Sequence, residues 1–324
     1  MASSVPRIAV LGSLNIDLVS YVPHHPAPGE TLTAKTFAVS PGGKGANQAV
    51  ACAKLSRARS SPHQDTSAHV SMVGTVGDDS YGALLTTNLA AHGVDVAGVA
   101  QRAGLKTGIA IIIVDEPSGQ NRIVLSPEAN HALQPADFAS GLGHMIPGPQ
   151  PDLLIMQLEI PLLTVAAAVK AAKTAGVPVL LNPAPAQKLP EEMYDGLAHL
   201  VVNETEAAIL AEVEESELDT EEGMEKVART FLARGVHNVL ITLGGRGVYF
   251  LSKAAGRKGL VPPKKAKVVD TTAAGDTFVG QYALEVVGGS FEIEAAVNKA
   301  NAAAAKTVEK MGAQDSIPWR DELV

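Results

Sequence analysis

Short runs of aliphatic and β-branched residues alternate with segments of helical periodicity along most of this chain. The apolar runs predict strands at residues 8–11, 70–75, 153–157, 177–181, 200–203 and 239–243. Segments of helical period lie between them, at residues 44–54, 79–92, 162–175, 203–212 and 223–234. Nearly continuous apolar strands separated by helices are typical of a parallel sheet covered on both faces. The pattern therefore predicts an α/β fold with a doubly wound, mainly parallel sheet flanked by helices.

Two segments break this alternation. Residues 18–39 and 106–125 contain strand patterns and Pro/Gly turns without an intervening helix. Paired strands inserted into an α/β chain can form a small separate sheet that covers a site on the larger part. We therefore predict a small β lid made of these two segments, and a large α/β domain made of residues 1–17, 40–105 and 126–324.

The remaining segments carry weaker patterns. Residues 56–68 have no periodicity, which predicts a flexible surface loop with solvated basic residues. After Gly275 the pattern predicts helix to the end of the chain. Its expected apolar stripe is Ile293, Val297, Ala300, Ala304, Val308 and Met311.

Composition and charge exclude several classes of protein. The 324 residues are 46% hydrophobic and 19% charged, which is typical of a globular chain. A net charge of -8 and an aromatic content of 4% argue against a nucleic-acid partner. The single Cys52 excludes an intramolecular disulfide, and polar residues interrupt the longest apolar stretch, 153–172, which argues against a membrane span. We expect a cytoplasmic protein, which in a eukaryotic cell could also enter the nucleus.

The most informative motif is Asp-Thr-Thr-Ala-Ala-Gly-Asp at residues 270–276. Small residues let the backbone approach a ligand, and the N-terminus of the following helix attracts anions. A carboxylate there, Asp276, could take a proton from a hydroxyl that attacks a bound phosphoryl group. The alternative is that Asp276 only complements the helix dipole.

Four further polar segments follow predicted strands or open predicted helices. Lys44 and Asn47 follow a glycine-rich turn and share one helix face, while Asn15 and Asp17 project to one side of an extended segment. The first pair could bind ligand hydroxyls and the second a vicinal diol, or each could belong to an ordinary loop or turn. The run at 203–206 could serve a Mg²⁺-nucleotide or form a helix capping box, and the glycines at 244–247 could line nucleotide phosphates or a hairpin.

Taken together, these segments resemble the ribokinase, or phosphofructokinase-B type, family of carbohydrate kinases. The resemblance covers nearly the whole chain. It rests on residues 12–17, 41–48, 77–79, 156–159, 182–185, 203–206, 242–247, 270–278 and 312–319.

The resemblance implies a role for particular residues. Asp276 would be the catalytic base, and the backbone of Ala273, Ala274 and Gly275 would form an anion hole for the transferred phosphoryl group. The implied sugar-binding residues are Asn15, Asp17, Gly43, Lys44, Asn47 and Glu159, together with Asp276. The implied nucleotide-binding residues are Asn203, Thr242, Gly244, Gly247, Gly275 and Asn301.

The resemblance also implies metal ions. Asn203 and Glu206 would hold Mg²⁺ through water, with ATP. A monovalent activator, K⁺, would bind beside the anion hole. Its ligands would be the backbone carbonyls of Asp270, Thr272, Thr307, Lys310 and Gly312 and the hydroxyl of Ser316.

The expected activity is ATP-dependent phosphorylation of D-ribose at O5, giving D-ribose 5-phosphate and ADP. Two alternatives remain at this point: a kinase for deoxyribose, fructose or adenosine, and a sensor of sugars without catalysis. The family often dimerises through the lid, so we also expect a homodimer.

Overall fold

The computed structural model describes residues 5–61, 66–254 and 256–323. Nine strands of the described chain form the large sheet, in the order β13-β12-β11-β10-β9-β8-β1-β4-β5. They are β1 (Arg7–Leu11), β4 (His69–Gly77), β5 (Asp95–Arg102), β8 (Leu153–Met156), β9 (Val179–Leu181), β10 (His199–Asn203), β11 (Asn238–Thr242), β12 (Val248–Ser252) and β13 (Lys258–Val261). The strands from β5 to β11 pair in parallel, and β12 and β13 add an antiparallel edge. This is the predicted mainly parallel α/β sheet.

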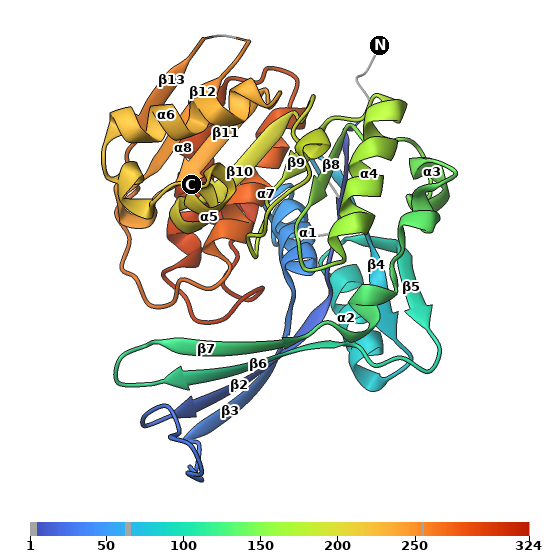
Figure 1. Ribbon diagram of the computed structural model, residues 1–324. Helices are drawn as coiled ribbons and strands as arrows, with labels where there is room; N and C mark the ends of the chain where they lie inside the picture. Colours follow the sequence, from blue (N-terminus) through green and yellow to red (C-terminus); the bar gives the residue numbers. More distant parts are fainter. Residues whose placement is uncertain (1–4, 62–65, 255, 324) are drawn as a thin grey trace.

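Helices cover both faces of this sheet (Figure 1). They are α1 (Lys44–Leu55), α2 (Ser80–Ala91), α3 (Leu142–Met145), α4 (Leu162–Ala175), α5 (Glu204–Ala211), α6 (Glu221–Ala233), α7 (Ala274–Val287) and α8 (Ile293–Thr307). Alternate strand residues enter two separate cores, one beneath α1, α2, α7 and α8, the other beneath α3 to α6. Single turns of 3-10 helix lie at Glu128–Ala132, Pro135–Phe138, Glu191–Met193, Glu215–Asp219, Gly244–Arg246 and Arg320–Glu322.

A second sheet projects from the carboxyl-end side of the large sheet (Figure 1). It contains β2 (Asn15–Val22), β3 (Thr36–Gly42), β6 (Gly108–Asp115) and β7 (Asn121–Ser126), in the order β3-β2-β6-β7. This is the small sheet that the sequence predicts. β2 begins at Asn15 and β3 ends at Gly42, beyond the predicted 18–39 segment, so both strands extend from the lid to the large domain.

The sequence reading missed both edge strands. β5 and β13 are partly exposed and contain no continuous apolar run, because an edge strand has a neighbour on one side only. The predicted helix after Gly275 is also wrong in its extent. It breaks between α7 and α8 and ends at Thr307, and the expected stripe residue Met311 is 54% exposed in the turns beyond.

The 56–68 segment differs from its prediction as well. Arg57 is buried rather than solvated, and it donates hydrogen bonds to the Gly93 carbonyl and the Ser56 hydroxyl. Residues 62–65 of that segment, like residues 1–4 of the predicted large domain, lie outside the described residues. Among the helices that the structure describes, none has the length and apolar character needed to cross a membrane.

Candidate active site

Two adjoining cavities lie where the carboxyl ends of the parallel strands meet α1 and α7. The smaller has a volume of about 230 Å³ and the larger about 470 Å³. Thr242, Thr271 and Gly275 line both of them. Ligands of open α/β sheets bind at this edge, so the two cavities together form the candidate site.

Asp276 lies in the first turn of α7, at the wall of the smaller cavity. Its side chain is 7% exposed, and each carboxylate oxygen accepts one hydrogen bond. Asn47 Nδ2 donates to Oδ2 at 3.1 Å and Gln48 Nε2 donates to Oδ1 at 3.0 Å. Because both donors come from α1, the contact between α1 and α7 fixes the orientation of this carboxylate.

The backbone before Asp276 has the conformation of a ligand-binding turn. Ala273 is the N-cap of α7 and adopts a left-handed conformation, with φ 61°. Such a conformation costs a residue other than glycine about 1–2 kcal/mol. Ala273 lines the smaller cavity, Ala274 the larger one and Gly275 both. The predicted anion-hole segment therefore lies at the junction of the two cavities.

Glu159 is the centre of a second cluster, at the base of the lid. Its Oε2 accepts hydrogen bonds from Ser13 Oγ at 2.6 Å, the Lys44 backbone nitrogen at 2.9 Å and Asn15 Nδ2 at 3.5 Å. The chain turns sharply at Gly43, with φ +87°, and a Cβ there would lie 2.7 Å from the Asn15 nitrogen. The segments around residues 13–15, 43–44 and 159 are thus held together.

Charge in this region is concentrated on four acids and one ammonium. Burial, Glu159 and Asp276 raise the pKa of Asp17 to about 7. Burial alone would lower the pKa of the Lys44 ammonium, but Asp276, Glu159 and Glu206 outweigh it and raise that pKa. Lys44 is therefore a protonated centre among carboxylates, suited to hold a ligand that carries both hydroxyls and negative charge.

Asn203 and Glu206 form a reciprocal capping box at the start of α5. Asn203 Oδ1 accepts from the Glu206 nitrogen at 2.8 Å, and Glu206 Oε2 accepts from the Asn203 nitrogen at 2.9 Å. Both residues also line the smaller cavity, and burial raises the pKa of Glu206. The helix capping box, the alternative interpretation of this run, is thus present. Only one carboxylate oxygen of Glu206 takes part in it.

The larger cavity contains most of the predicted nucleotide-binding residues. Thr242, Gly244, Gly247 and Asn301 line it together with Gly275. Asn301 Nδ2 donates to the Pro262 carbonyl at 3.2 Å. Lys264 and Lys265 also line this cavity, and no sequence signal marked them. Its glycine- and alanine-rich wall offers backbone and shape rather than side-chain chemistry.

The predicted K⁺ ligands lie in two segments that a carboxylate joins. Asp270 accepts hydrogen bonds from the Thr272 backbone and hydroxyl and from the Gly312 nitrogen. Among the described residues, no hydrogen bond is given to the carbonyl oxygens of Asp270, Thr272, Lys310 or Gly312. Ser316 is fully buried nearby. These neutral oxygens suit a monovalent cation. No cluster of three or more His, Cys, Asp or Glu that could hold a metal occurs in the described chain.

Several polar residues around the cavities were assigned no role from the sequence. They are Ser13, Gln48, Asn130, Gln157, Asn182 and Gln314, all buried and hydrogen-bonded around the cavities. Five of them lie inside the motifs quoted above, and buried amides at strand and helix ends could have marked them. Asn130 follows β7 in a short turn without any distinctive pattern. It donates to Asn15 Oδ1 at 2.8 Å.

Comparison with known proteins identifies relatives over nearly the whole chain. Residues 5–320 match the description "pfkB family carbohydrate kinase". A ribokinase from Schizosaccharomyces pombe is 44% identical over 315 residues, covering 96% of this chain and 95% of the relative. A deoxyribokinase from Salmonella typhi is 35% identical over 312 residues, covering 96% of this chain and 95% of the relative. The structure of Arabidopsis thaliana ribokinase complexed with ribose and ATP superposes with a TM-score of 0.82 at 30% identity, covering 99% and 98% of the two chains. This chain therefore belongs to the pfkB family of carbohydrate kinases.

Proposed function

We propose that this enzyme transfers the γ-phosphoryl group of ATP to O5 of D-ribose, giving D-ribose 5-phosphate and ADP. The observation that carries the proposal is the position of Asp276. Both of its oxygens accept hydrogen bonds, and it lines the smaller cavity next to Gly275, which lines both cavities. The similarity to ribokinases over nearly the whole chain supports ribose as the sugar.

Asp276 acts as the general base of this reaction. It takes the proton of the primary hydroxyl, and the sugar oxygen forms a bond to the γ-phosphorus. The bond from that phosphorus to the β–γ bridging oxygen breaks, and its electron pair leaves with ADP. The Ala274 N–H donates to the Thr271 carbonyl at 3.2 Å, so among the predicted anion-hole groups the Gly275 N–H at the start of α7 would face the charge that develops on the phosphoryl oxygens. Catalysis therefore depends on position and charge.

The remaining sugar hydroxyls bind at the lid side of the site. Asp17 and Glu159 supply acceptors, and Lys44 and Asn47 supply donors. A deoxy sugar would leave one of these buried polar groups without a partner, which costs affinity. This arrangement favours ribose over deoxyribose, which is the substrate in the name of one relative.

Mg²⁺ would be held through water by Asn203 and the free oxygen of Glu206. Both residues line the cavity beside Asp276, and hard oxygen donors suit this ion. Bound with ATP, it supplies positive charge to the β- and γ-phosphate oxygens. Lys44, at the same cavity, contributes a second positive charge from the chain itself.

K⁺ would fix the anion-hole loop from behind, through the carbonyls of Asp270, Thr272, Thr307, Lys310 and Gly312 and the Ser316 hydroxyl. The Asp270 bridge to Gly312 already brings the two segments together. We expect activity to fall when Na⁺ replaces K⁺ at constant ionic strength, because the smaller ion fits the same oxygens poorly. Equal rates in the two salts would remove the cation from the proposal.

A panel assay tests the function. ATP consumption is measured with ribose, deoxyribose, fructose and adenosine, and ribose is expected to give the highest kcat/KM. A higher value for another substrate replaces ribose by that substrate. ADP formation with none of them, together with sugar binding measured by calorimetry, would favour a sensor.

A homodimer through the lid also belongs to this proposal. The small sheet exposes large apolar side chains, among them Phe37, Ile123 and Val124, which are 59%, 57% and 62% exposed. A monomer by light scattering at working concentrations would contradict the dimer. The cytoplasmic location remains a prediction.

A further inference from the structure

A chain of side-chain amides ends on one oxygen of the Asp276 carboxylate. Asn88 Nδ2, on α2, donates to Gln314 Oε1 at 2.6 Å. Gln314 Nε2 donates to Asn47 Oδ1 at 3.1 Å, and Asn47 Nδ2 donates to Asp276 Oδ2 at 3.1 Å. Gln314 and Asn47 are 3% and 7% exposed, so solvent does not compete with these bonds.

A second, shorter chain ends on the other oxygen. Gln157 Nε2 donates to Gln48 Oε1 at 2.6 Å, and Gln48 Nε2 donates to Asp276 Oδ1 at 3.0 Å. Gln48 Nε2 also donates to Asn182 Oδ1 at 3.0 Å. Gln48 and Gln157 are fully buried. Both carboxylate oxygens are therefore oriented by amides that are themselves oriented by other amides.

The direction of donation along such a chain has to agree at both of its ends. A primary amide donates through nitrogen and accepts through oxygen, so a donor at one side requires an acceptor at the other. Gln314 gives its NH₂ group to the oxygen of Asn47, which leaves the Asn47 NH₂ group for Asp276. An ionised carboxylate only accepts hydrogen bonds. Reversing Asn47 would place two oxygens against each other.

We propose that Gln314 is a positioning residue for the catalytic base, acting by fixing which end of the Asn47 amide faces Asp276. This inference rests on the proposed function only in taking Asp276 as the base. Gln314 lines neither cavity, so contact with a ligand there does not account for its burial. Its side-chain oxygen accepts from Asn88, and its side-chain nitrogen donates to Asn47. Its backbone oxygen accepts from Lys54 Nζ at 3.0 Å.

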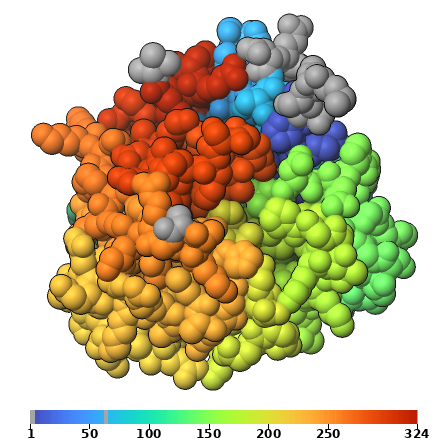
Figure 2. Space-filling model, turned by 90° about the horizontal axis from the view of Figure 1, so that it is seen from above, coloured from blue at the N-terminus to red at the C-terminus, as the bar shows by residue number. Residues whose placement is uncertain are grey.

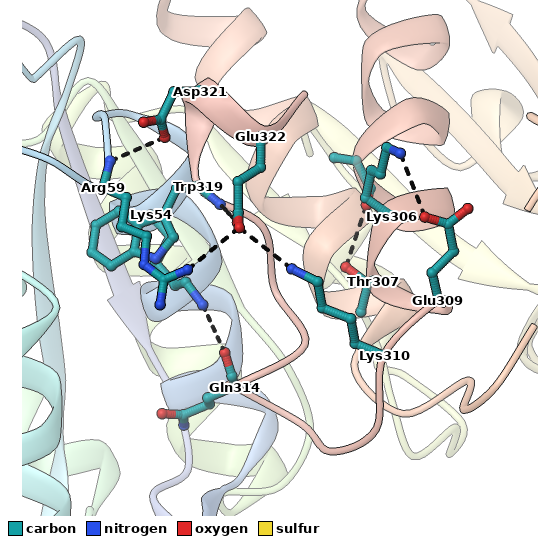
Figure 3. Close-up of polar contacts among 11 residues, drawn as sticks. Lys54, Arg59, Lys306, Thr307, Glu309, Lys310, Gln314, Trp319, Asp321 and Glu322 are labelled. Atoms are coloured by element: carbon teal, nitrogen blue, oxygen red, sulfur yellow. Dashed lines mark hydrogen bonds and ion pairs between the residues drawn. The ribbon is translucent and has the colours of Figure 1, made fainter. Parts of the chain in front are cut away.

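The segment after α8 holds Gln314 in place (Figure 3). Lys54 is 4% exposed, and its ammonium lies 5.5 Å from the centroid of the Trp319 ring. Glu322 accepts from the Trp319 nitrogen at 2.8 Å and pairs with Lys310 at 3.5 Å. Seen from the side away from the lid, this C-terminal part of the chain, in red, lies beside blue segments from its first quarter (Figure 2). The segment after α8 is thus connected to Asp276 by hydrogen bonds through Gln314 and Asn47.

Two variants of Gln314 separate positioning from packing. Gln314→Glu keeps the shape but can only accept, so it draws the Asn47 NH₂ group away from Asp276. We expect kcat to fall about 10- to 100-fold, the range of one charge-assisted hydrogen bond, with little change in KM for ATP. Gln314→Met removes the side-chain bonds but leaves Asn47 free to keep its direction, so kcat should fall less than about 5-fold. A packing role predicts the opposite order, since Met loses more contacts, and that order would overturn the proposal.

Neutron diffraction on crystals grown in D₂O provides a readout independent of activity. The deuterated amide of Asn47 should face Asp276 in the wild-type protein and face residue 314 in Gln314→Glu. A purely electrostatic effect of the new charge would leave Asn47 unchanged, which would also overturn the proposal. If Gln314→Glu does not fold, the wild-type map still decides, because an Asn47 oxygen facing Asp276 contradicts the inference. Failure of the proposed function is distinct: the wild-type enzyme would then phosphorylate no sugar, whatever the orientation of Asn47.

Discussion

The two cavities that meet at Gly275 are built in different ways. Carboxylates, amides and one ammonium line the smaller cavity, and the Asp276 and Asn182 side chains there both accept hydrogen bonds from Gln48. Glycine, alanine and exposed lysines line the larger one, where Asn301 is the buried side chain with a hydrogen bond. Buried polar groups discriminate strongly, because a ligand that lacks one partner leaves a group unpaired. The smaller cavity should therefore set the chemistry and the choice of sugar, while the larger one accepts its ligand mainly by shape.

The sharpest test of this contrast removes the charge of the base. Asp276→Asn keeps the size of the side chain, and we expect kcat to fall about 10³-fold, within the range of general base catalysis. The KM for ribose should change far less, because the other sugar contacts remain. Steady-state kinetics with a thermal melt as the folding control measures this. Turnover within 10-fold of the wild type would remove Asp276 from the mechanism.

A pair of glycines compares the predicted sugar-binding cluster at the base of the lid with the larger cavity. A Cβ on Gly42 would lie 2.2 Å from the Asp17 carboxylate, whereas a Cβ on Gly245 would meet no atom within 4 Å. We expect Gly42→Ala to raise the KM for ribose about 10- to 100-fold by displacing Asp17, with the KM for ATP unchanged. Gly245→Ala, in the wall of the larger cavity, is the matched control and should leave the KM for ribose within 2-fold. Equal effects of the two variants on the KM for ribose would contradict the contrast between the two regions.

The sequence predicts the fold well where apolar runs are continuous. α4 has the predicted bounds, and β1, β4 and β8 lie within two residues of theirs. The half-exposed edge strands β5 and β13 were not predicted, and the predicted helix after Gly275 extends past the end of α8 at Thr307. Val308 continues the apolar period there, but the chain turns away to bring Gly312 to Asp270. The period of apolar residues predicts which residues are buried. It does not predict a turn that is held by a carboxylate far away in sequence.

The sequence assigned roles to the charged residues around the cavities and to some amides such as Asn47, but to neither Gln48 nor Gln314. Asp276 and Lys44 lie in glycine-rich motifs whose chemistry can be recognised from the sequence alone. Gln48 donates to the base directly and Gln314 is connected to it through Asn47, but the partners of these two glutamines lie 228 and 267 residues away in sequence. An amide has no preferred role until its neighbours are known. The structure supplies those neighbours.

The acidic cluster of Asp17, Glu159 and Asp276 should also cost the protein stability at high pH. Asp17 has a pKa of about 7 in the folded chain, against 3.8 for the free side chain. The folded state therefore binds this proton more tightly, and stability falls as pH rises from about 4 to about 7. Asp17→Asn removes the charge, so at pH 8 without sugar it should be more stable than the wild type by roughly 1–4 kcal/mol, raising Tm by several degrees. Melting curves at pH 4 and pH 8 measure this, and an equal difference at both would contradict the assignment. No such gain is expected from changes at the larger cavity.

The smallest effect is expected where the two cavities join. Ala273 holds φ 61°, a conformation that costs alanine about 1–2 kcal/mol and glycine almost nothing. Glycine also loses more backbone entropy on folding, by about 0.5–1 kcal/mol, so Ala273→Gly should stabilise the protein by roughly 0.5–1 kcal/mol. Ala302→Gly, in the interior of α8, is the matched control and should destabilise by about 1 kcal/mol. Because the anion hole uses backbone N–H groups, kcat of Ala273→Gly should stay within about 3-fold of the wild type. A large loss of kcat with the expected gain in Tm would mean that the methyl group of Ala273 itself shapes the junction, and that the chemistry at this point depends on a side chain after all.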